Sequence, residues 1–377
     1  MPTGESQYSR AGGARQNLSD RLLLSVIVST LNSRSTLRQV LAAIRGSELP
    51  RKSYEIIVVD DASADGSAAI AARYADTVVK LTGHPAGPAY ARNRGVELAR
   101  GEVIAFVDGD VVVCPDTLPR LLATLLERQD LDAVSASHEM ISGAPNFVSQ
   151  YWNLLLSFGE QRHSGRCAQF APGCGVVRRA AFLSAGMYDE WRFDSACMEG
   201  VELGERLLGA GRSAILSSEV KVTHLKQWSV VSVCQEVWHR SRVLARSLGY
   251  LRMSAAAPGE VVFTLCRTLI PAVALLGTLM LAAAFVPSPH TAAKISVALA
   301  ALLLTNLPMH RFYASTRGLW FAIVSAPLHI VVQIVAAMAL CTGWVLRDVF
   351  GDVSPDATTQ AYSEVGLEIW PPVPRKL

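Results

Sequence analysis

Two carboxylates lie one residue apart at the end of an apolar run, in the stretch "EVIAFVDGD" that ends at Asp110. Asp108 and Asp110 would repel each other in a crevice, and such repulsion raises the pKa of one member of a pair. A hard divalent cation removes the conflict, because Mg²⁺ and Mn²⁺ prefer oxygen ligands and keep open positions for phosphate oxygens. The pair is therefore a candidate metal site, while two aspartates in a turn, taken alone, are also typical of a solvated loop.

The elements that must position these aspartates follow an alternating pattern between residues 22 and 137. Short β-branched runs alternate with helix-like stretches, which is the rhythm of βαβ units and predicts a mainly parallel sheet with helices on both faces. In such sheets ligands bind beyond the carboxyl ends of the strands, where Asp60, Asp61 and Asp108 fall. The expected strands are residues 22–28, 54–60, 76–81, 102–108 and 132–137, and the expected helices are residues 35–45, 67–74, 89–99 and 115–128.

The chain after residue 146 gives weaker signals. We expect a helix over residues 147–158, a Gly-rich strand "APGCGVV", a helix over residues 201–210, and the strands "SAIL" and "EVKVTH". Residues 228–252 have the pattern of a basic amphipathic helix, which favours either the membrane interface or a solvated surface.

Composition limits the possible functions. The chain has 377 residues, of which 50% are hydrophobic, and a mean hydropathy of +0.28, so apolar sequence remains after a full-sized domain is buried. The net charge of +3 is too even to indicate nucleic acid as the main partner. Seven cysteines without a CxxC pair indicate reduced thiols on the cytosolic side. No signal peptide is visible in the polar residues 1–20.

The remaining apolar sequence lies towards the C-terminus. Residues 261–286 and 319–346 are long enough to span a bilayer, and residues 292–307 form either a third span or a re-entrant segment. Basic residues before the first span and in the loop 309–317 place the N-terminal domain in the cytoplasm and residues 287–291 on the other side. We expect a multi-pass protein of the cell membrane. Its predicted parts are a disordered N-terminal segment (1–20), an α/β domain (21–227), an amphipathic interfacial segment (228–258), a transmembrane region (259–346) and an irregular tail (347–377).

Four motifs occur in a fixed order: "SVIVSTLNS", "IIVVDDASADGS", "GPAYARNRG" and "FVDGD". This ordered set, within residues 22–242, resembles the family 2 glycosyltransferases of the GT-A fold. The resemblance implies a nucleotide-sugar donor and a Mg²⁺ or Mn²⁺ ion. By position it implies a donor site made of Thr30, Asn32, Asp60, Asp61, Arg92, Asn93 and Asp108, with Asp108 and Asp110 at the metal. The simpler interpretation is that Asp60 and Asp65 cap a turn and that Arg92 pairs with Glu97.

The catalytic base is harder to assign. The segment "MEGVELGERLLGAG" resembles the one that bears the base in the family, but Gly200 stands where a second carboxylate is usual. Glu199 is our candidate for a base or acceptor-orienting group, and Glu202, three residues on, is expected to be mainly structural. His224, at the end of a predicted strand, matches a late metal or phosphate ligand and also fits a structural histidine.

These features predict an inverting, metal-dependent glycosyltransferase that acts on a membrane-associated acceptor, either lipid-linked or part of a glycolipid or polysaccharide. In that reaction a carboxylate deprotonates the acceptor hydroxyl, whereas a lipid phosphate would need no base. The alternative is an inactive family member that serves as a membrane scaffold or partner subunit, which Gly200 favours. Nucleotidyl transfer is less favoured, because "STLNSRSTL" is not a Gly-rich phosphate loop.

Overall fold

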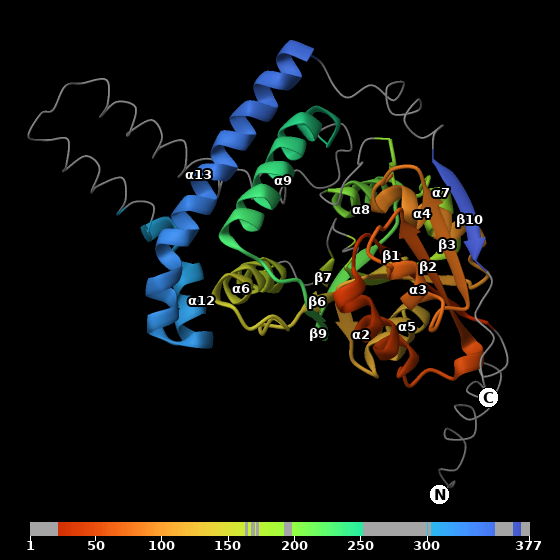
Figure 1. The fold of residues 1–377 in the computed structure, drawn as a ribbon. Helices are drawn as coiled ribbons and strands as arrows, with labels where there is room; N and C mark the ends of the chain where they lie inside the picture. The colour runs from red at the N-terminus through yellow and green to blue at the C-terminus, as the bar shows by residue number, and fades with distance from the viewer. Residues whose placement is uncertain are drawn as a thin grey trace, which may run out of the picture. The chain divides into compact units, whose positions relative to one another are not determined.

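A computed structural model of the chain describes residues 22–162, 165–166, 170, 173–191, 198–251, 300, 303–350 and 365–370. The chain divides into two compact units, which we describe separately (Figure 1). Unit 1 contains residues 1–137, 163–225 and 354–377, and unit 2 contains residues 138–162 and 226–353. Residues 138–162 thus pack with unit 2, although the sequence placed them in the α/β domain. The predicted domain boundaries themselves stay a prediction.

Unit 1 is built on one sheet with the strand order β10-β3-β2-β1-β4-β8-β6-β9-β5, and β7 pairs with β9. Its parallel part, β3-β2-β1-β4, comes from the alternating N-terminal region, as predicted. The strands are β1 (Leu24–Thr30), β2 (Tyr54–Asp61), β3 (Thr77–Thr82), β4 (Val103–Asp108), β5 (Val111–Val113), β6 (Ala133–His138), β7 (Gly165–Arg166), β8 (Cys174–Arg178), β9 (Ala214–His224) and β10 (Gly366–Trp370).

The prediction of a mainly parallel sheet is wrong beyond β4. From there on the pairs β4–β8, β6–β8, β5–β9 and β7–β9 are antiparallel, so the sheet is mixed. The strands "SAIL" and "EVKVTH" form one strand, β9, rather than two. β5 was not foreseen because its three residues are too few to show a period.

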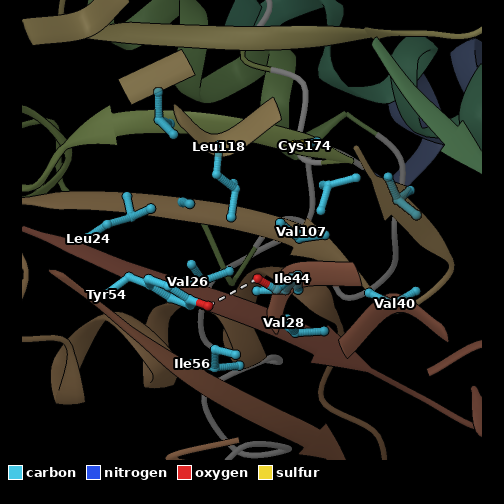
Figure 2. Close-up of a cluster of buried hydrophobic side chains, with 14 of the residues drawn as sticks. Leu24, Val26, Val28, Val40, Ile44, Tyr54, Ile56, Val107, Leu118 and Cys174 are labelled. Carbon is cyan, nitrogen blue, oxygen red and sulfur yellow. Dashed lines mark hydrogen bonds between the residues drawn. The ribbon is translucent and has the colours of Figure 1, made fainter. Parts of the chain in front are cut away.

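Helices cover both faces of the sheet, as predicted. One face carries α2 (Arg34–Arg45), α3 (Ser67–Ala71) and α5 (Thr117–Glu127), and the other carries α4 (Pro88–Leu98), α7 (Arg179–Ser184) and α8 (Glu199–Gly209). A short 3₁₀ helix, Arg51–Ser53, precedes β2. Figure 2 shows the first of the two cores, where alternate residues of β1, β2 and β4 meet Val40 and Ile44 of α2. The Tyr54 hydroxyl donates to the Ile44 carbonyl oxygen at 3.3 Å and closes this core at its edge.

Unit 2 is helical in its described part. It contains α6 (Phe147–Arg162), α9 (Val230–Leu251), α12 (Leu307–Arg317) and α13 (Leu319–Phe350), around an aromatic-rich core. The predicted helices 147–158 and 228–252 are thereby confirmed as α6 and α9. Residues 309–317, expected as a loop, are part of α12, because their Met309 and Tyr313 are buried against α6 and α13.

One helix in the described part of the chain, α13, is long and apolar enough over residues 319–347 to cross a membrane. It corresponds to the predicted span 319–346. The predicted span 261–286, the loop 287–291, most of the span 292–307 and the N-terminal segment 1–20 lie outside the described residues, so a multi-pass arrangement is not supported by the structure. The described cysteines Cys114, Cys174, Cys234 and Cys341 are free thiols.

The C-terminal tail, expected to be irregular, contains a strand. β10 pairs antiparallel with β3, with Ile369 opposite Val79, and so becomes the edge of the sheet in unit 1 (Figure 1). Its sequence "GLEIW" alternates apolar and polar residues, but five residues beyond a long apolar region give too weak a signal to assign a strand.

Candidate active site

The candidate site begins where three neighbouring strands of unit 1 end. In the parallel register Thr30 of β1 lies beside Asp60 of β2, and Ser29 lies beside Asp108 of β4. The sheet therefore brings together side chains that are far apart in the sequence, at the carboxyl edge where the sequence predicted a ligand. Gly109 follows Asp108 and approaches β1 so closely that a Cβ there would lie 3.1 Å from the Thr30 Oγ1 atom.

Thr30 and Asp60 carry buried polar atoms without good hydrogen-bond partners. Thr30 is 4% exposed and Asp60 is fully buried, and neither the Thr30 Oγ1 atom nor either Asp60 carboxylate oxygen makes a bond of good geometry. Burial raises the pKa of Asp60, although the Ser63 side chain is near enough to oppose the rise. Buried polar atoms left in this state are costly to a fold, so these two residues are candidates for ligand contacts.

Asp61 and Asn93, which the resemblance placed at the donor, have structural partners instead. The two Asp61 carboxylate oxygens accept bonds from the amides of Ala86 and Gly87, at 2.8 and 2.9 Å, and hold the loop before α4. The Asn93 side chain donates to the Tyr188 carbonyl oxygen at 2.9 Å and accepts from the Tyr188 amide at 3.1 Å. Both residues are buried and these bonds shape the site, while their contact with a donor stays a prediction.

The loops after β1 and β2 are tied to each other. Asn32, at a positive φ of 50°, accepts a bond from the Ala64 amide at 3.0 Å, and its own amide donates to the Ser63 Oγ atom at 2.8 Å. Asp65 accepts from the Arg34 amide at 2.8 Å and caps the turn, as the simpler interpretation expected. Asn32 thus stays at the exposed rim of the candidate site, and Ser63, three residues after Asp60, lies close enough to the Asp60 carboxyl to lower its pKa.

Arg92 joins two carboxylates from distant elements. Its Nη2 atom lies 2.8 Å from the Asp108 Oδ1 atom and its Nη1 atom lies 3.0 Å from the Glu199 Oε1 atom, while its side chain is only 3% exposed. Burial alone would lower the pKa of Arg92, but the neighbouring carboxylates raise it. The interpretation that Arg92 pairs with Glu97 is wrong, because Arg94 makes that contact at 3.1 Å.

The two candidate base residues differ in their surroundings. Glu199 is the first residue of α8 and reaches Arg92 across the site. Glu202 is bound by Arg206, one turn further along α8, which also donates to the Met187 carbonyl oxygen at 2.6 Å. Glu202 thus fastens α8 to the turn after α7, which is the structural position expected of it. The catalytic roles of both residues stay predictions.

Asp110 and His224 form the second part of the site. β5 and β9 pair so that Val111 lies opposite His224, and this register brings the His224 Nε2 atom to 3.4 Å from the Asp110 Oδ2 atom. Both side chains are partly exposed, at 28% for Asp110 and 15% for His224. Within the described ranges no cluster of three or more metal-binding side chains occurs. The Asp110 carboxylate nevertheless fits a hard divalent ion that takes its other ligands from phosphate oxygens and water, and His224 is a possible nitrogen ligand beside it.

Sequence reasoning missed one residue of the site. The Tyr188 ring lies beside the Arg92 guanidinium, with 5.5 Å between the Arg92 Cζ atom and the ring centre. Burial raises the pKa of Tyr188, and its hydroxyl oxygen makes no hydrogen bond within the described part of the chain. The segment "GMYDE" has no periodicity that points to this position, so only the fold reveals it.

The strand-end aspartates, the Arg92 bridge and the Asp110–His224 pair lie on a GT-A-like α/β fold. Residues 25–185 match the model of the family described as glycosyl transferase family 2. Residues 25–185 are therefore similar to family 2 glycosyltransferases, and this similarity supports the predicted enzyme class.

Individual relatives extend this match. The chain is 27% identical over 251 residues to the succinoglycan biosynthesis protein ExoO of Rhizobium meliloti. This match covers 62% of this chain and 69% of the relative. It is 37% identical over 111 residues to the putative glycosyltransferase EpsH of Bacillus subtilis, but the match spans only 29% of this chain and 32% of that protein. Among solved structures, the mannosyltransferase PcManGT of Pyrobaculum calidifontis, in complex with GDP-Man and Mn²⁺, superimposes with a TM-score of 0.56 at 19% identity, covering 90% of this chain and 93% of that one.

Proposed function

We propose that the protein is an inverting, metal-dependent glycosyltransferase that moves a sugar from a nucleotide-sugar donor to a membrane-associated acceptor. The observation that carries the proposal is the pairing of Asp110 with His224 at the same sheet edge as the unpartnered atoms of Thr30 and Asp60. One end of this edge offers metal ligands, and the other offers buried hydrogen-bonding groups. A nucleoside diphosphate sugar needs both.

Thr30 and Asp60 are proposed to contact the nucleoside. A buried hydroxyl and a buried carboxylate can accept or donate bonds to the polar edge of a base or to a ribose hydroxyl, which would relieve the cost of leaving them unpaired. Asn32 closes this part of the site from the rim, where its side chain is held by the loop after β2. Asp61 and Asn93 support this part of the site through their bonds to the loop before α4 and to Tyr188.

Asp110 and His224 are proposed to hold the divalent ion, Mg²⁺ or Mn²⁺. When bound, the ion stabilises the charge that the leaving diphosphate gains. Asp108 has a different role in this proposal, because its Oδ1 atom is engaged by Arg92. Arg92 fixes the direction of the Asp108 side chain, and through it the turn that carries Asp110.

Glu199 is proposed to act on the acceptor. The same Arg92 side chain that orients Asp108 orients Glu199, so the donor side and the acceptor side share one buried cation. A carboxylate held in this way can accept the proton of an acceptor hydroxyl while the diphosphate leaves from the opposite face. The membrane-associated acceptor is proposed from the apolar helix α13, which accounts for a membrane-bound protein.

A donor screen tests the proposal. Purified full-length protein is mixed with UDP-, GDP- and dTDP-sugars, with Mg²⁺, with Mn²⁺ or with EDTA, and both hydrolysis and thermal stabilisation are measured. We expect one donor class to raise the melting temperature in the presence of metal, because a ligand that binds the folded state stabilises it. Absence of binding and hydrolysis with every donor would instead favour the inactive scaffold.

Asp110→Asn is the decisive variant, and Asp116→Asn is its control. The Asp110 substitution removes a ligand charge without a change in size, so metal-dependent donor binding and transfer should be lost while the fold is retained. Asp116 is 48% exposed at the start of α5 and pairs with Arg120, so its substitution should change neither. Near-normal turnover of Asp110→Asn would contradict the assignment.

A further inference from the structure

One side of α13 in unit 2 presents a continuous exposed apolar surface. We call it the α13 stripe, and the exposed fractions of its residues range from 43% at Val331 to 77% at Trp320. At about 100° per residue these positions fall within an arc of about 80° along a length of about 43 Å. Exposed apolar surfaces of this size mark an interaction site. The stripe consists of Trp320, Ile323, Val331, Met338, Val345 and Val349.

The neighbouring helices cover other sides of α13. α9 runs beside its C-terminal half, where Gly343 is so close to α9 that a Cβ would lie 2.5 Å from the Arg242 carbonyl oxygen (Figure 1). α12 runs antiparallel beside its N-terminal half, with the rings of His310 and His329 6.1 Å apart and those of Tyr313 and Phe321 5.9 Å apart. The buried side of α13 is mainly apolar but includes two polar contacts, in which Gln333 and His329 bond to Asn306.

Those neighbours carry charged side chains beside the apolar length of α13. Arg311, next to His310 on α12, is exposed at the level of the α13 segment that faces α12. On α9, Arg240 is 42% exposed and pairs with Glu236, within two turns of the contact with Gly343. A bilayer core about 30 Å thick takes up about 20 residues of a helix. If α13 crossed it, at least one of these charged sites would lie at hydrocarbon depth, where charged side chains are disfavoured.

We propose that α13 lies along the membrane surface instead of crossing the membrane. The stripe would sink into the boundary between lipid headgroups and acyl chains, and α9 and α12 would remain on the aqueous side. Trp320 suits this boundary, because tryptophan prefers the membrane interface. Arg317 and Arg347, at the two ends of α13, would both meet headgroup phosphates, which favours a surface of anionic lipid.

This inference does not depend on the donor site, and it replaces the predicted span over residues 319–346 by an in-plane helix. The two arrangements differ in the depth of the middle of α13. In the plane, all stripe positions lie about 5–10 Å below the headgroup boundary. Across the bilayer, the depth changes along the helix and Val331 lies close to the centre, about 15 Å from either boundary.

Depth measurement by spin labelling tests the proposal. Full-length protein, with its native cysteines replaced, is reconstituted into vesicles of phosphatidylcholine and phosphatidylglycerol and labelled at Ile323→Cys, Val331→Cys or Val345→Cys. We expect equal, shallow depths at the three positions. Ser315→Cys, exposed on α12, serves as the aqueous control. A deep Val331 flanked by shallow ends would overturn the proposal, and so would labels that meet neither lipid nor water.

Sidedness gives an independent measurement. In sealed vesicles, Arg317→Cys and Arg347→Cys are treated with a membrane-impermeant maleimide. An in-plane helix leaves both ends on one side, so the two cysteines should react to the same extent before the vesicles are opened. Reaction of one end only, with the other end released by detergent, would show a crossing helix.

Discussion

Removal of the buried cation Arg92 should destabilise unit 1 strongly. Arg92→Met keeps much of the side-chain volume but removes the cation that joins Asp108 to Glu199, which is 2% exposed. Breaking a buried ion pair by removing one partner costs about 3–5 kcal/mol. For a unit of this size each kcal/mol lowers the melting temperature by about 2–4 °C, so the expected fall is about 6–20 °C.

The assay is thermal and urea unfolding of the full-length protein, with Arg120→Met as the control. Arg120 is 43% exposed and pairs with exposed carboxylates, so its loss should cost less than about 1 kcal/mol. The double variant Arg92→Met/Glu199→Gln should recover part of the stability, because it removes one of the two carboxylates that lose their bond to Arg92. An Arg92→Met protein as stable as Arg120→Met, or a double variant without recovery, would refute this reasoning.

Two further predictions concern single carboxylates. Glu199→Gln should lower the rate of sugar transfer about 10²–10⁴-fold with donor binding retained. Glu202→Gln should mainly lower the melting temperature, because it releases Arg206. Normal transfer by Glu199→Gln would indicate an acceptor that supplies its own anion. Because the pKa of Asp60 is raised by burial, the folded state binds more protons than the unfolded state above pH 3.8, and stability falls as pH rises through the raised pKa. Asp60→Asn should remove this pH dependence of the unfolding free energy, measured by urea unfolding, and should weaken donor binding. At neutral pH it should raise the unfolding free energy by about 1.4 kcal/mol for each unit by which the fold raises the pKa of Asp60. An unchanged pH profile would argue against a buried Asp60 that is charged at neutral pH.

The parallel half of the sheet could be predicted from the sequence because each of its strands has a local signature. The runs before Thr30, Asp60 and Asp108 are β-branched, of strand length, and followed by helix-forming stretches. Their ends had to meet at one edge, since parallel strands share their direction. That rule placed Asp60 and Asp108 correctly, and the family resemblance added Thr30 at the same edge.

The contacts that organise the site could not be predicted, because they join segments without a shared local signal. Arg92 and Glu199 are 107 residues apart, and neither segment has a sequence pattern that indicates the other as its partner. The sequence suggested Glu97 for Arg92 as a partner on the same helix, but their spacing of five residues does not fit the i,i+3 or i,i+4 rule, which Arg94 and Glu97 satisfy. The bonds of Asp61 to the loop before α4 and of Asn93 to Tyr188 likewise join segments that carry no shared signal.

The position of β10 in the sequence means that the sheet of unit 1 can be completed only late in the synthesis of the chain. The partner strand β3 ends at Thr82, but β10 begins at Gly366, after the whole of unit 2 has been translated. At a translation rate of about 5–20 residues per second, β10 is synthesised about 15–60 s after β3, and the edge of β3 stays unpaired during that time. An unpaired edge can recruit strands from neighbouring nascent chains during that time. The pairing of β10 with β3 is thus among the last events of synthesis. A chain that terminates before β10 keeps β3 as an unpaired edge strand, which can pair with other chains.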